Sequence, residues 1–435
     1  MDFASYLVVA ITLYVVCFAS LTYICIIADP RKNPVANLIM HKAPNKFADG
    51  VKWLMGETIK GKLDSFTHYC ANEPHPFMQV VYCFIVFGGW TVMFHYGFTL
   101  VPNTYVGGYH KYNGYVVFLL CISSYVTVVK ASPGTITAMT LTKYDNYDYD
   151  KIMFHPGQTC PTVGIRKLAR SKYDRMTRRH VPRFDHYCGW LNNTIGEENY
   201  RLFIWFLIVH TGMLWYGVVL TVLIFKSEAA TLNLKYAAFY DNRGRPLRTS
   251  YVIVVQYLIQ EHNMLAALLL LMFVMALIVS GFLCFHIYLI SRGMTTNEFY
   301  KWNEIQKRHK ILRMDYAKAV AEGRVTVTPT KTSDKSIESD TGSDSLHHSE
   351  DTDGVLVDIP DADVGCTGAV VVNNDGTDNS EIDEDATQTD PGILPTRSHY
   401  NLGLIANIQE VFFPRCFRPE AQKRYSEFIQ AQKSK

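Results

Sequence analysis

The chain has 435 residues and a formal net charge of +2, and this total favours neither an acidic nor a basic partner because its basic and acidic segments cancel. Apolar residues make up 48% of the chain and gather into long uncharged blocks, a pattern that argues against an ordinary soluble domain. Its ten cysteines, five of which lie inside these blocks, exclude the close-spaced framework of a small secreted disulfide protein.

Five apolar stretches are candidates for crossing a membrane, since each reaches the roughly 20 residues that a helix needs to span about 30 Å of hydrocarbon. They cover residues 3–28, 77–101, 112–132, 201–225 and 264–290. No basic residue precedes the first stretch and no small-residue cleavage site follows it, so we interpret 1–28 as a retained N-terminal anchor. The sequence therefore predicts an all-α polytopic membrane protein with about five transmembrane helices.

The basic residues of the loops predict the orientation of these helices. The loop 29–76 carries seven Lys and Arg after the first span, whereas the connection between the second and third spans offers only Lys111. Because Lys and Arg favour the cytosolic side, we expect a lumenal N-terminus and a cytosolic C-terminus. The basic loop 226–263 is an exception to this pattern, since it would be lumenal. The pair of spans in 77–132 then leads to a cytosolic insert over residues 133–200.

This insert contains a carboxylate, an imidazole and a thiol within four positions, in Asp185, His186 and Cys188. In an extended strand His186 and Cys188 point to the same side with Cα atoms about 6.6 Å apart, so the imidazole can reach the sulfur. Such a pair is the core of an activated thiolate nucleophile. Asp185 would face away in a flat strand, so the segment must turn if Asp185 is to orient the imidazole. Alone, the pattern is more often a polar loop beside a buried cysteine.

The insert is followed by a second pair of spans, 201–290, and by three segments predicted to be cytosolic. Residues 291–324 begin with the run Thr295-Thr296-Asn297-Glu298. Residues 325–398 hold seventeen Asp and Glu against three Lys and Arg, and we expect them to be a disordered acidic insertion. Residues 399–435 contain an apolar pattern from Leu404 to Phe413 that predicts a short packed or interfacial helix.

In this context the chain resembles the DHHC family of protein S-acyltransferases, or palmitoyltransferases. That family carries the pattern C-x2-C-x9-H-C-x2-C-x2-C-x4-D-H-H-C-x5-C between membrane spans, and the distance from Cys160 to Cys188 fits it without an insertion. The run from Arg166 to Lys172 is similar to the family's R-K-P-A-R-S-K. Trp190 and several residues as far as Phe203 match the segment after its active site. The resemblance implies a cysteine-rich-type domain of small β-hairpins and loops, inserted between spans 3 and 4.

Two further motifs are similar to the family. Thr295 to Glu298 resembles its T-T-x-E, which implies a contact between Thr296 and Asp185. The segment 400–413 resembles its C-terminal motif, which implies that Asn407 ties this segment to the helix bundle. The family's D-P-G after a span is replaced by Ser132-Pro133-Gly134.

The chain departs from the family at the zinc ligands. Six of the eight ligand positions hold Val163, Tyr173, Asp174, Thr177, Tyr187 and Thr194, which leaves Cys160 and His180 as remnants. Because structural zinc needs four N or S ligands, we expect no metal site. Hydrogen bonds and packing by Tyr173, Tyr187 and Thr194 must then hold the loops together. A decayed enzyme would lose catalytic residues as readily as zinc ligands, and here Asp185, His186 and Cys188 are all present.

The resemblance implies transfer of a long-chain acyl group from acyl-CoA to cysteines of cytosolic or membrane proteins through a thioester on Cys188. His186 would be the general base and Asp185 its orienting residue. Lys167, Arg170 and Lys172 are candidates for binding the CoA phosphates, or for facing an anionic lipid surface. The expected location is an endomembrane, ER or Golgi, with the bilayer as partner and no nucleic acid. The alternatives are an inactive acyl-binding or scaffolding homologue and, less favoured, a transporter. A transporter could use His95, His210 and His286, in or near the spans, as a polar pathway, but most such histidines are simply packed and hydrogen-bonded.

Overall fold

The structure is a computed structural model that describes residues 38, 61, 62, 65, 66, 68, 69, 73–240, 244–324 and 391–434. The predicted anchor 1–28, most of the loop 29–76 and most of the acidic insertion lie outside these residues. The chain divides into two compact units, Met1–Ile305 with Pro395–Lys435, and Gln306–Leu394. The membrane-length helices and the predicted site belong to the first unit.

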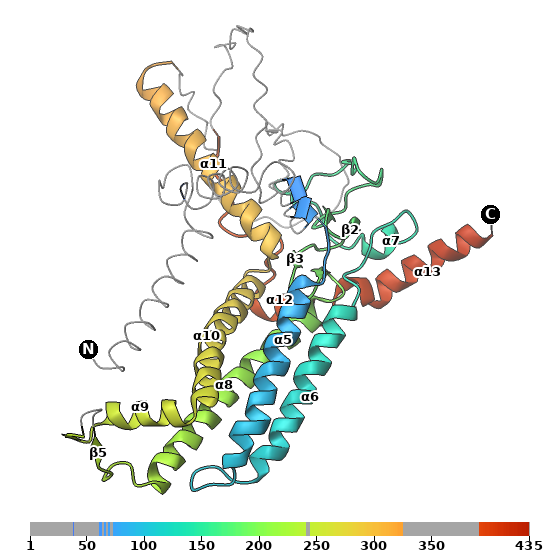
Figure 1. Ribbon diagram of the computed structural model, residues 1–435. Coiled ribbons are helices and arrows are strands. Elements are labelled where there is room, and N and C mark those ends of the chain that lie inside the picture. Colours follow the sequence, from blue (N-terminus) through green and yellow to red (C-terminus); the bar gives the residue numbers. More distant parts are fainter. Residues whose placement is uncertain are drawn as a thin grey trace, which may run out of the picture. The chain divides into compact units, whose positions relative to one another are not determined.

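Four helices are long and apolar enough to cross a membrane: Phe77–Leu100, Tyr109–Lys130, Tyr200–Thr231 and Asn263–Ser291. The first consists of α5 (Phe77–Val92), a π-helical turn η3 (Met93–Gly97) and a 3-10 turn η4 (Phe98–Leu100), and the others are α6, α8 and α10. These match four of the five predicted spans. In Figure 1 they pack side by side, and α8 contacts both α6 and α10.

Several polar side chains within these helices are hydrogen-bonded inside the apolar surrounding. Ser124 donates to the carbonyl of Cys121 at 2.9 Å. Tyr82 Oη and His210 Nε2 lie 2.7 Å apart, and His210 Nδ1 donates to the carbonyl of Phe206 at 2.9 Å. The pair of Tyr82 and His210 thus joins α5 to α8 by a hydrogen bond inside the bundle.

The segment between α6 and α8 contains a short helix, α7 (Leu141–Tyr144), and two antiparallel hairpins. β1 (Lys172–Asp174) pairs with β2 (Arg179–Val181), with Tyr173 opposite His180. β3 (His186–Cys188) pairs with β4 (Asn193–Ile195), with Tyr187 opposite Thr194. This agrees with the small hairpin and loop fold that the sequence predicts, and the second hairpin carries the proposed nucleophile.

The loop 226–263 has structure that the sequence analysis did not predict. It contains a small hairpin of β5 (Phe239–Tyr240) and β6 (Pro246–Leu247), then α9 (Tyr251–Glu261). The side chain of Ser250 caps α9 by accepting a hydrogen bond from Ile253 N at 3.4 Å. Figure 1 draws α9 at the end of the bundle opposite the β3–β4 hairpin. Its apolar run is too short for a span, so hydropathy alone did not reveal it.

The C-terminal part of the first unit comprises α12 (Leu404–Phe412), η5 (Arg415–Phe417) and α13 (Pro419–Lys433), and α11 (Thr296–Ala321) starts directly after α10. α12 packs against α10 and α8. Gly293, between α10 and α11, has φ +64, and a Cβ there would lie 2.5 Å from the carbonyl oxygen of Tyr400. Only glycine allows the C-terminal segment to approach this closely.

Candidate active site

The β3–β4 hairpin is fixed to the end of α6. The side-chain amide of Asn193 donates to the carbonyls of Val128 and Val129 at 3.2 Å and of Ala131 at 2.8 Å. These are among the last carbonyls of α6, which have no partner within the helix. Leu191 and Ile195 anchor the other face of the hairpin in the apolar core. The strand that carries Cys188 is therefore held at one end of the bundle.

Asp185, His186 and Cys188 lie together as the motif predicts. Asp185 precedes β3 and turns its carboxylate back, so that His186 Nδ1 donates to Asp185 Oδ2 at 2.6 Å. The imidazole also makes a side-chain hydrogen bond with Cys188. Asp185 is 2% exposed and Cys188 is 8% exposed. This is the order carboxylate, imidazole, nucleophile that activates a thiol.

Thr296 completes the support of Asp185. Its N–H donates to Asp185 Oδ1 at 2.7 Å and its hydroxyl donates to Asp185 Oδ2 at 3.0 Å. Thr295 and Glu298 form a capping box at the start of α11, since Glu298 N donates to Thr295 Oγ1 at 3.2 Å and Thr295 N donates to Glu298 Oε2 at 2.9 Å. The outer residues of the T-T-x-E run thus begin a helix, which leaves Thr296 free to bind the carboxylate.

These contacts shift the pKa values of both partners. Burial opposes ionisation of Asp185, but the hydrogen bond and positive charge of His186 outweigh it, so the pKa of Asp185 lies below its ordinary value. Burial also opposes a charge on His186, yet its hydrogen bonds to Asp185 and Cys188 raise the pKa of His186 to about 10. At neutral pH His186 is therefore an imidazolium.

An apolar cavity of about 540 Å³ opens beside this hairpin. His186, Cys188 and Trp190 contribute to its lining. It follows the first membrane-length helix from Tyr82 to Phe98, sixteen residues or about 24 Å of helical rise, and its other walls come largely from α8 and α10. A long apolar cavity that contacts a reactive cysteine suits a hydrocarbon chain better than a polar molecule.

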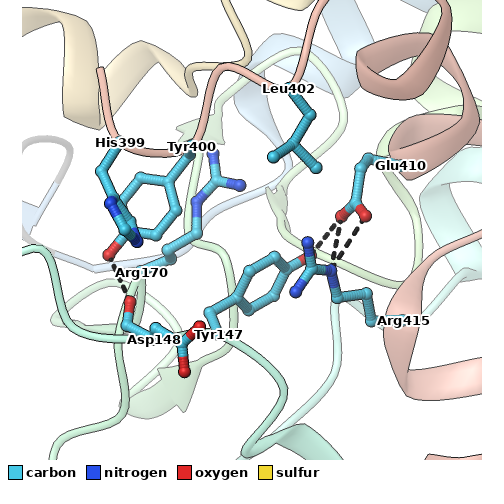
Figure 2. Close-up of a pocket in the computed structure, with 8 residues that line it drawn as sticks. All are labelled: Tyr147, Asp148, Arg170, His399, Tyr400, Leu402, Glu410 and Arg415. Atoms are coloured by element: carbon cyan, nitrogen blue, oxygen red, sulfur yellow. Dashed lines mark hydrogen bonds and ion pairs between the residues drawn. The ribbon is translucent and has the colours of Figure 1, made fainter. Parts of the chain in front are cut away.

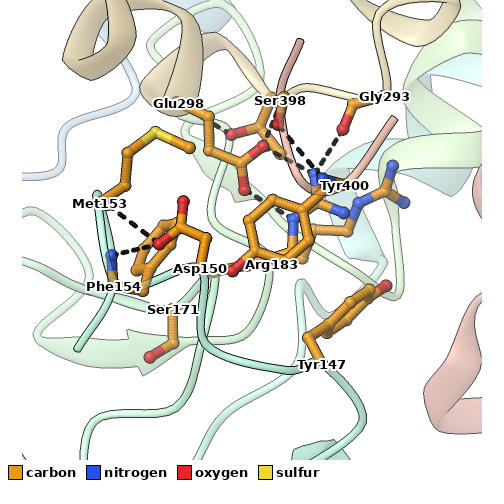
Figure 3. A network of polar contacts seen from close by, with 12 residues as sticks. Tyr147, Asp150, Met153, Phe154, Ser171, Arg183, Gly293, Glu298, Ser398 and Tyr400 are labelled. Carbon is orange, nitrogen blue, oxygen red and sulfur yellow. Dashed lines mark hydrogen bonds and ion pairs between the residues drawn. The ribbon is translucent and has the colours of Figure 1, made fainter. Parts of the chain in front are cut away.

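A buried ion pair connects the insert to the end of α10. Arg170 Nε donates to Glu298 Oε1 and Arg170 Nη2 donates to Glu298 Oε2, both at 2.6 Å, and Nη2 also donates to the carbonyl of Gly293 at 2.9 Å. Figure 3 shows Glu298 and Gly293 beside Tyr400. The guanidinium of Arg170 lies 4.5 Å from the centre of the Tyr400 ring. The pair therefore joins the insert, α11 and the C-terminal segment.

This arrangement corrects one expectation. Arg170 is 2% exposed and its guanidinium is bound to Glu298, so it does not face a CoA phosphate. A small pocket of about 80 Å³ beside it is lined by Tyr147, Asp148, Arg170, His399, Tyr400, Leu402, Glu410 and Arg415. Figure 2 shows Arg415 turned toward Glu410, whose carboxylate accepts from Arg415 Nε at 2.9 and 3.0 Å. The cations here are largely neutralised.

The remaining predicted residues are placed as follows. Asn407 donates to the carbonyl of Ser291 at 3.1 Å and accepts from Leu402 N at 3.0 Å, which ties the C-terminal segment to the end of α10. Trp190 lines the cavity, and its carbonyl accepts from Tyr125 Oη at 3.2 Å. Lys167 and Lys172 are half-buried on the insert.

The residues at the second family zinc position form a hydrogen-bonded cluster that does not fit a metal. Asp174 Oδ2 accepts from Thr177 Oγ1 at 2.6 Å and from the hydroxyl of Thr194, and Thr177 N donates to the same oxygen at 3.2 Å. Tyr187 turns away to donate to Asn192 Oδ1 at 2.6 Å. The hydrogen-bond donors around the Asp174 carboxylate stabilise its negative charge. The cluster offers no set of four tetrahedral ligands for a metal ion.

The first family zinc position fits no better. Cys160 and His180 are both buried, and Ser171 Oγ lies 2.8 Å from His180 Nε2. Burial lowers the pKa of His180 to about 4, with a contribution from Lys167. Among the residues that the structure describes, the one group of three or more possible metal ligands is Asp185, His186 and His286, in which Asp185 and His186 already bind each other.

Some residues at the site were not predicted from the sequence. Glu298 was noted only as part of a motif, and His286 was considered one of several packed histidines within spans. The spacing of Thr295 and Glu298 is a signal that could have revealed the capping box. For His286 no local pattern exists, because its neighbours at the site come from other elements.

The fold thus has four helices of membrane-spanning length and places Asp185, His186 and Cys188 beside an apolar cavity. Residues 153–303 match the family described as DHHC palmitoyltransferase. The chain is 33% identical over 188 residues to "Palmitoyltransferase ZDHHC4" of Mus musculus, covering 43% of this chain and 55% of the relative. It is 33% identical over 199 residues to "Palmitoyltransferase SWF1" of Yarrowia lipolytica, covering 45% and 50%. The matches thus span about half the length of these curated relatives.

Proposed function

We propose that the chain is a membrane-bound protein S-acyltransferase that moves a long-chain fatty acyl group, such as palmitoyl, from acyl-CoA to protein cysteines. The observation that carries the proposal is the joined set of Asp185, His186 and Cys188 on the wall of an apolar cavity. The family match and the names of the relatives support it. An inactive homologue is less favoured, since decay would not preserve a carboxylate held by three hydrogen bonds.

In the first step the thiolate of Cys188 attacks the carbonyl carbon of the acyl-CoA thioester. The carbon–sulfur bond to CoA breaks, and the leaving thiolate takes a proton from the imidazolium of His186. This leaves an acyl thioester on Cys188 and neutral His186. Asp185 keeps Nδ1 of His186 protonated, so that Nε2 exchanges the proton.

In the second step neutral His186 removes the proton of an acceptor cysteine thiol. The resulting thiolate attacks the acyl carbonyl on Cys188, and Cys188 leaves as a thiolate that again pairs with the imidazolium. No other reactant is required. Asp185 remains ionised in both steps, which agrees with the direction of its pKa shift.

The cavity supplies binding energy for the acyl chain, since each buried CH2 is worth about 0.8 kcal/mol. Its far end is narrow: Phe98 packs on Gly114, where an added Cβ would lie 2.3 Å from the Phe98 ring.

Lys167 and Lys172 on the insert are the proposed contacts for the CoA phosphates.

The proposal includes no structural zinc, because the hydrogen bonds of Asp174 join the hairpins where the family uses metal. It includes a lumenal N-terminus, a cytosolic C-terminus and a location in an endomembrane, ER or Golgi, which brings Cys188 to cytosolic and membrane protein substrates. The basic loop 29–76 supports this orientation.

The proposal is tested by incubating purified protein in detergent with an alkyne-tagged palmitoyl-CoA and then with a peptide that contains one cysteine. Wild type should acquire a label that hydroxylamine removes, and should pass it to the peptide. Cys188→Ser should acquire none, while Cys284→Ser, on the exposed side of α10, should behave as wild type. Equal labelling of Cys188→Ser and wild type would overturn the assignment.

A further inference from the structure

His286 is a buried polar residue that the mechanism above does not use. It lies on α10, five residues before the helix ends at Ser291, and is 0% exposed. Its ring contacts the edges of Phe203, Phe282 and Phe285. Its Nδ1 lies 3.0 Å from Tyr200 Oη, whereas its Nε2 is buried without a hydrogen-bond partner. Such orphaned atoms are rare in folded proteins and call for an explanation.

The bond to Tyr200 decides which nitrogen of neutral His286 carries the proton. Within the described part of the chain, the buried hydroxyl of Tyr200 has no hydrogen-bond partner except His286 Nδ1. If Nδ1 carried the proton, the O–H of Tyr200 would have no acceptor. Tyr200 therefore donates, Nδ1 accepts, and the single proton of the ring lies on Nε2. The atom left without a partner is then a donor.

A suitable acceptor lies close by. A carboxylate oxygen of Asp185, a ring nitrogen of His186 and a ring nitrogen of His286 all lie within 4.8 Å of one another. The Asp185 carboxylate accepts three hydrogen bonds, from His186 Nδ1 and from the N–H and hydroxyl of Thr296. A carboxylate has about four acceptor sites, so one is left for a further donor. The rings of His186 and His286 have centroids 5.8 Å apart.

We propose that His286 is a positioning residue for the transferase reaction: after a small shift from its position here, where Nε2 has no partner, Nε2–H donates to the Asp185 carboxylate, and Tyr200 fixes that tautomer. The inference rests on the proposed function. A neutral hydrogen-bond donor at the position of His286 fixes the orientation of the Asp185 carboxylate without adding a second positive charge beside the His186 imidazolium. It thereby keeps His186 Nε2 turned toward Cys188 in both steps of the reaction.

The test compares His286→Phe, which fills the space but removes the donor, with His286→Gln, whose amide can place an N–H near the position of Nε2. Tyr200→Phe removes the group that fixes the tautomer, and Cys284→Ser is a control on the same helix. The groups that can titrate around His286 are Asp185, His186 and Tyr200, and Arg183 lies against the Tyr200 ring at 5.8 Å.

Two rates are measured from pH 6 to 9: formation of the Cys188 thioester in a single turnover with palmitoyl-CoA, and alkylation of Cys188 by iodoacetamide. Loss of one hydrogen bond to a charged group predicts that His286→Phe slows both rates about tenfold at pH 7 and moves the alkylation profile to higher pH. His286→Gln should stay within about threefold of wild type, and Tyr200→Phe should lie between the two.

The inference is overturned if a folded His286→Phe keeps the wild-type alkylation profile, or if His286→Gln is as impaired as His286→Phe. Folding is compared by thermal unfolding in the same detergent. Alkylation of Cys188 needs no acyl-CoA, so it tests the positioning role of His286 independently of the proposed transferase function. If wild type forms no thioester while His286→Phe still shifts the alkylation profile, the transferase proposal fails and the positioning role stands.

Discussion

At the scale of single residues, the pair of Asp185 and His186 sets the protonation state of the site. Asp185 is held by Thr296 as well as by His186, and burial makes each of these hydrogen bonds stronger than it would be in water. The imidazolium is therefore the resting form of His186, and in the proposed reaction its proton passes to the leaving thiolate of CoA.

This pair predicts how stability depends on pH. The pKa of His186 is raised from 6.5 to about 10 in the folded protein, so its contribution to stability is fully present below about pH 6.5 and is lost as pH rises through 10. Wild type should therefore unfold at a higher temperature than His186→Ala at pH 6.5, and the difference should shrink toward pH 10. In an Asp185→Asn background, the His186→Ala substitution should show little of this pH dependence. A difference that grows with pH would contradict the assignment.

The residues of the site differ in how well sequence predicts them. Asp185, His186 and Cys188 are adjacent in the chain, so a short motif suffices. Arg170 was assigned to phosphate because an Arg in a basic run is usually exposed, and only the fold brings Glu298, 128 residues away, against it. His286 could not be predicted for the same reason, since its role depends on contacts among three distant segments.

At the scale of elements, hydrogen bonds connect the two hairpins where the family has zinc. The Asp174 carboxylate joins the β1–β2 turn, through Thr177, to β4, through Thr194. The sequence predicted that hydrogen bonds and packing must replace metal, but it assigned the role to Tyr173, Tyr187 and Thr194. Of these only Thr194 lies in the cluster, because the carboxylate that organises it is Asp174.

Removing the Asp174 carboxylate should destabilise the insert, whereas treatment with a zinc chelator should not. Asp174→Ala leaves the buried hydroxyl of Thr194 without its acceptor and should lower the free energy of unfolding by about 3 kcal/mol. A strong chelator should leave both the melting temperature and thioester formation of wild type unchanged. Elemental analysis that finds two zinc ions per chain, or loss of activity on chelation, would contradict this account.

The end of α10 is a second place where elements meet. The sequence predicted four spans to within a few residues of the ends of the observed helices, except that α8 continues to Thr231. It did not predict the close approach of the C-terminal segment at Gly293, because sequence pattern does not report contacts between distant segments.

Gly293→Ala should displace the C-terminal segment. The new Cβ would lie 2.5 Å from the Tyr400 carbonyl oxygen, at a φ of +64 that alanine rarely adopts. We expect faster amide hydrogen exchange over residues 398–412 and slower thioester formation, since Arg170 also binds the Gly293 carbonyl. Gly281→Ala on α10, where a Cβ meets nothing within 4 Å, is the matched control. Equal exchange in the two variants would contradict the prediction.

At the scale of the whole molecule, every contact assigned to the site lies in the first compact unit, Met1–Ile305 with Pro395–Lys435. The family match, residues 153–303, falls within the same unit. The acidic composition of residues 325–398 argues against a catalytic role, and every hydrogen bond assigned above to Asp185, His186 and Thr296 joins described residues outside this segment.

Deletion of residues 330–390 should therefore preserve thioester formation to within about twofold, because surface changes away from packed features alter stability little. The measurement is single-turnover labelling of the deletion variant and wild type in the same detergent. If the variant folds, as judged by its melting temperature, and yet forms no thioester, the acidic segment takes part in catalysis.

The central claim is that Cys188 carries the acyl group during turnover. The most direct measurement is peptide-level mass spectrometry of the purified protein, quenched in acid after one turnover with palmitoyl-CoA, together with the amount of CoA released. The account predicts a palmitoyl thioester on the Cys188 peptide, in amounts that match the released CoA, and none in Cys188→Ser. Release of CoA with the acyl group on other cysteines, or unchanged in Cys188→Ser, would contradict it.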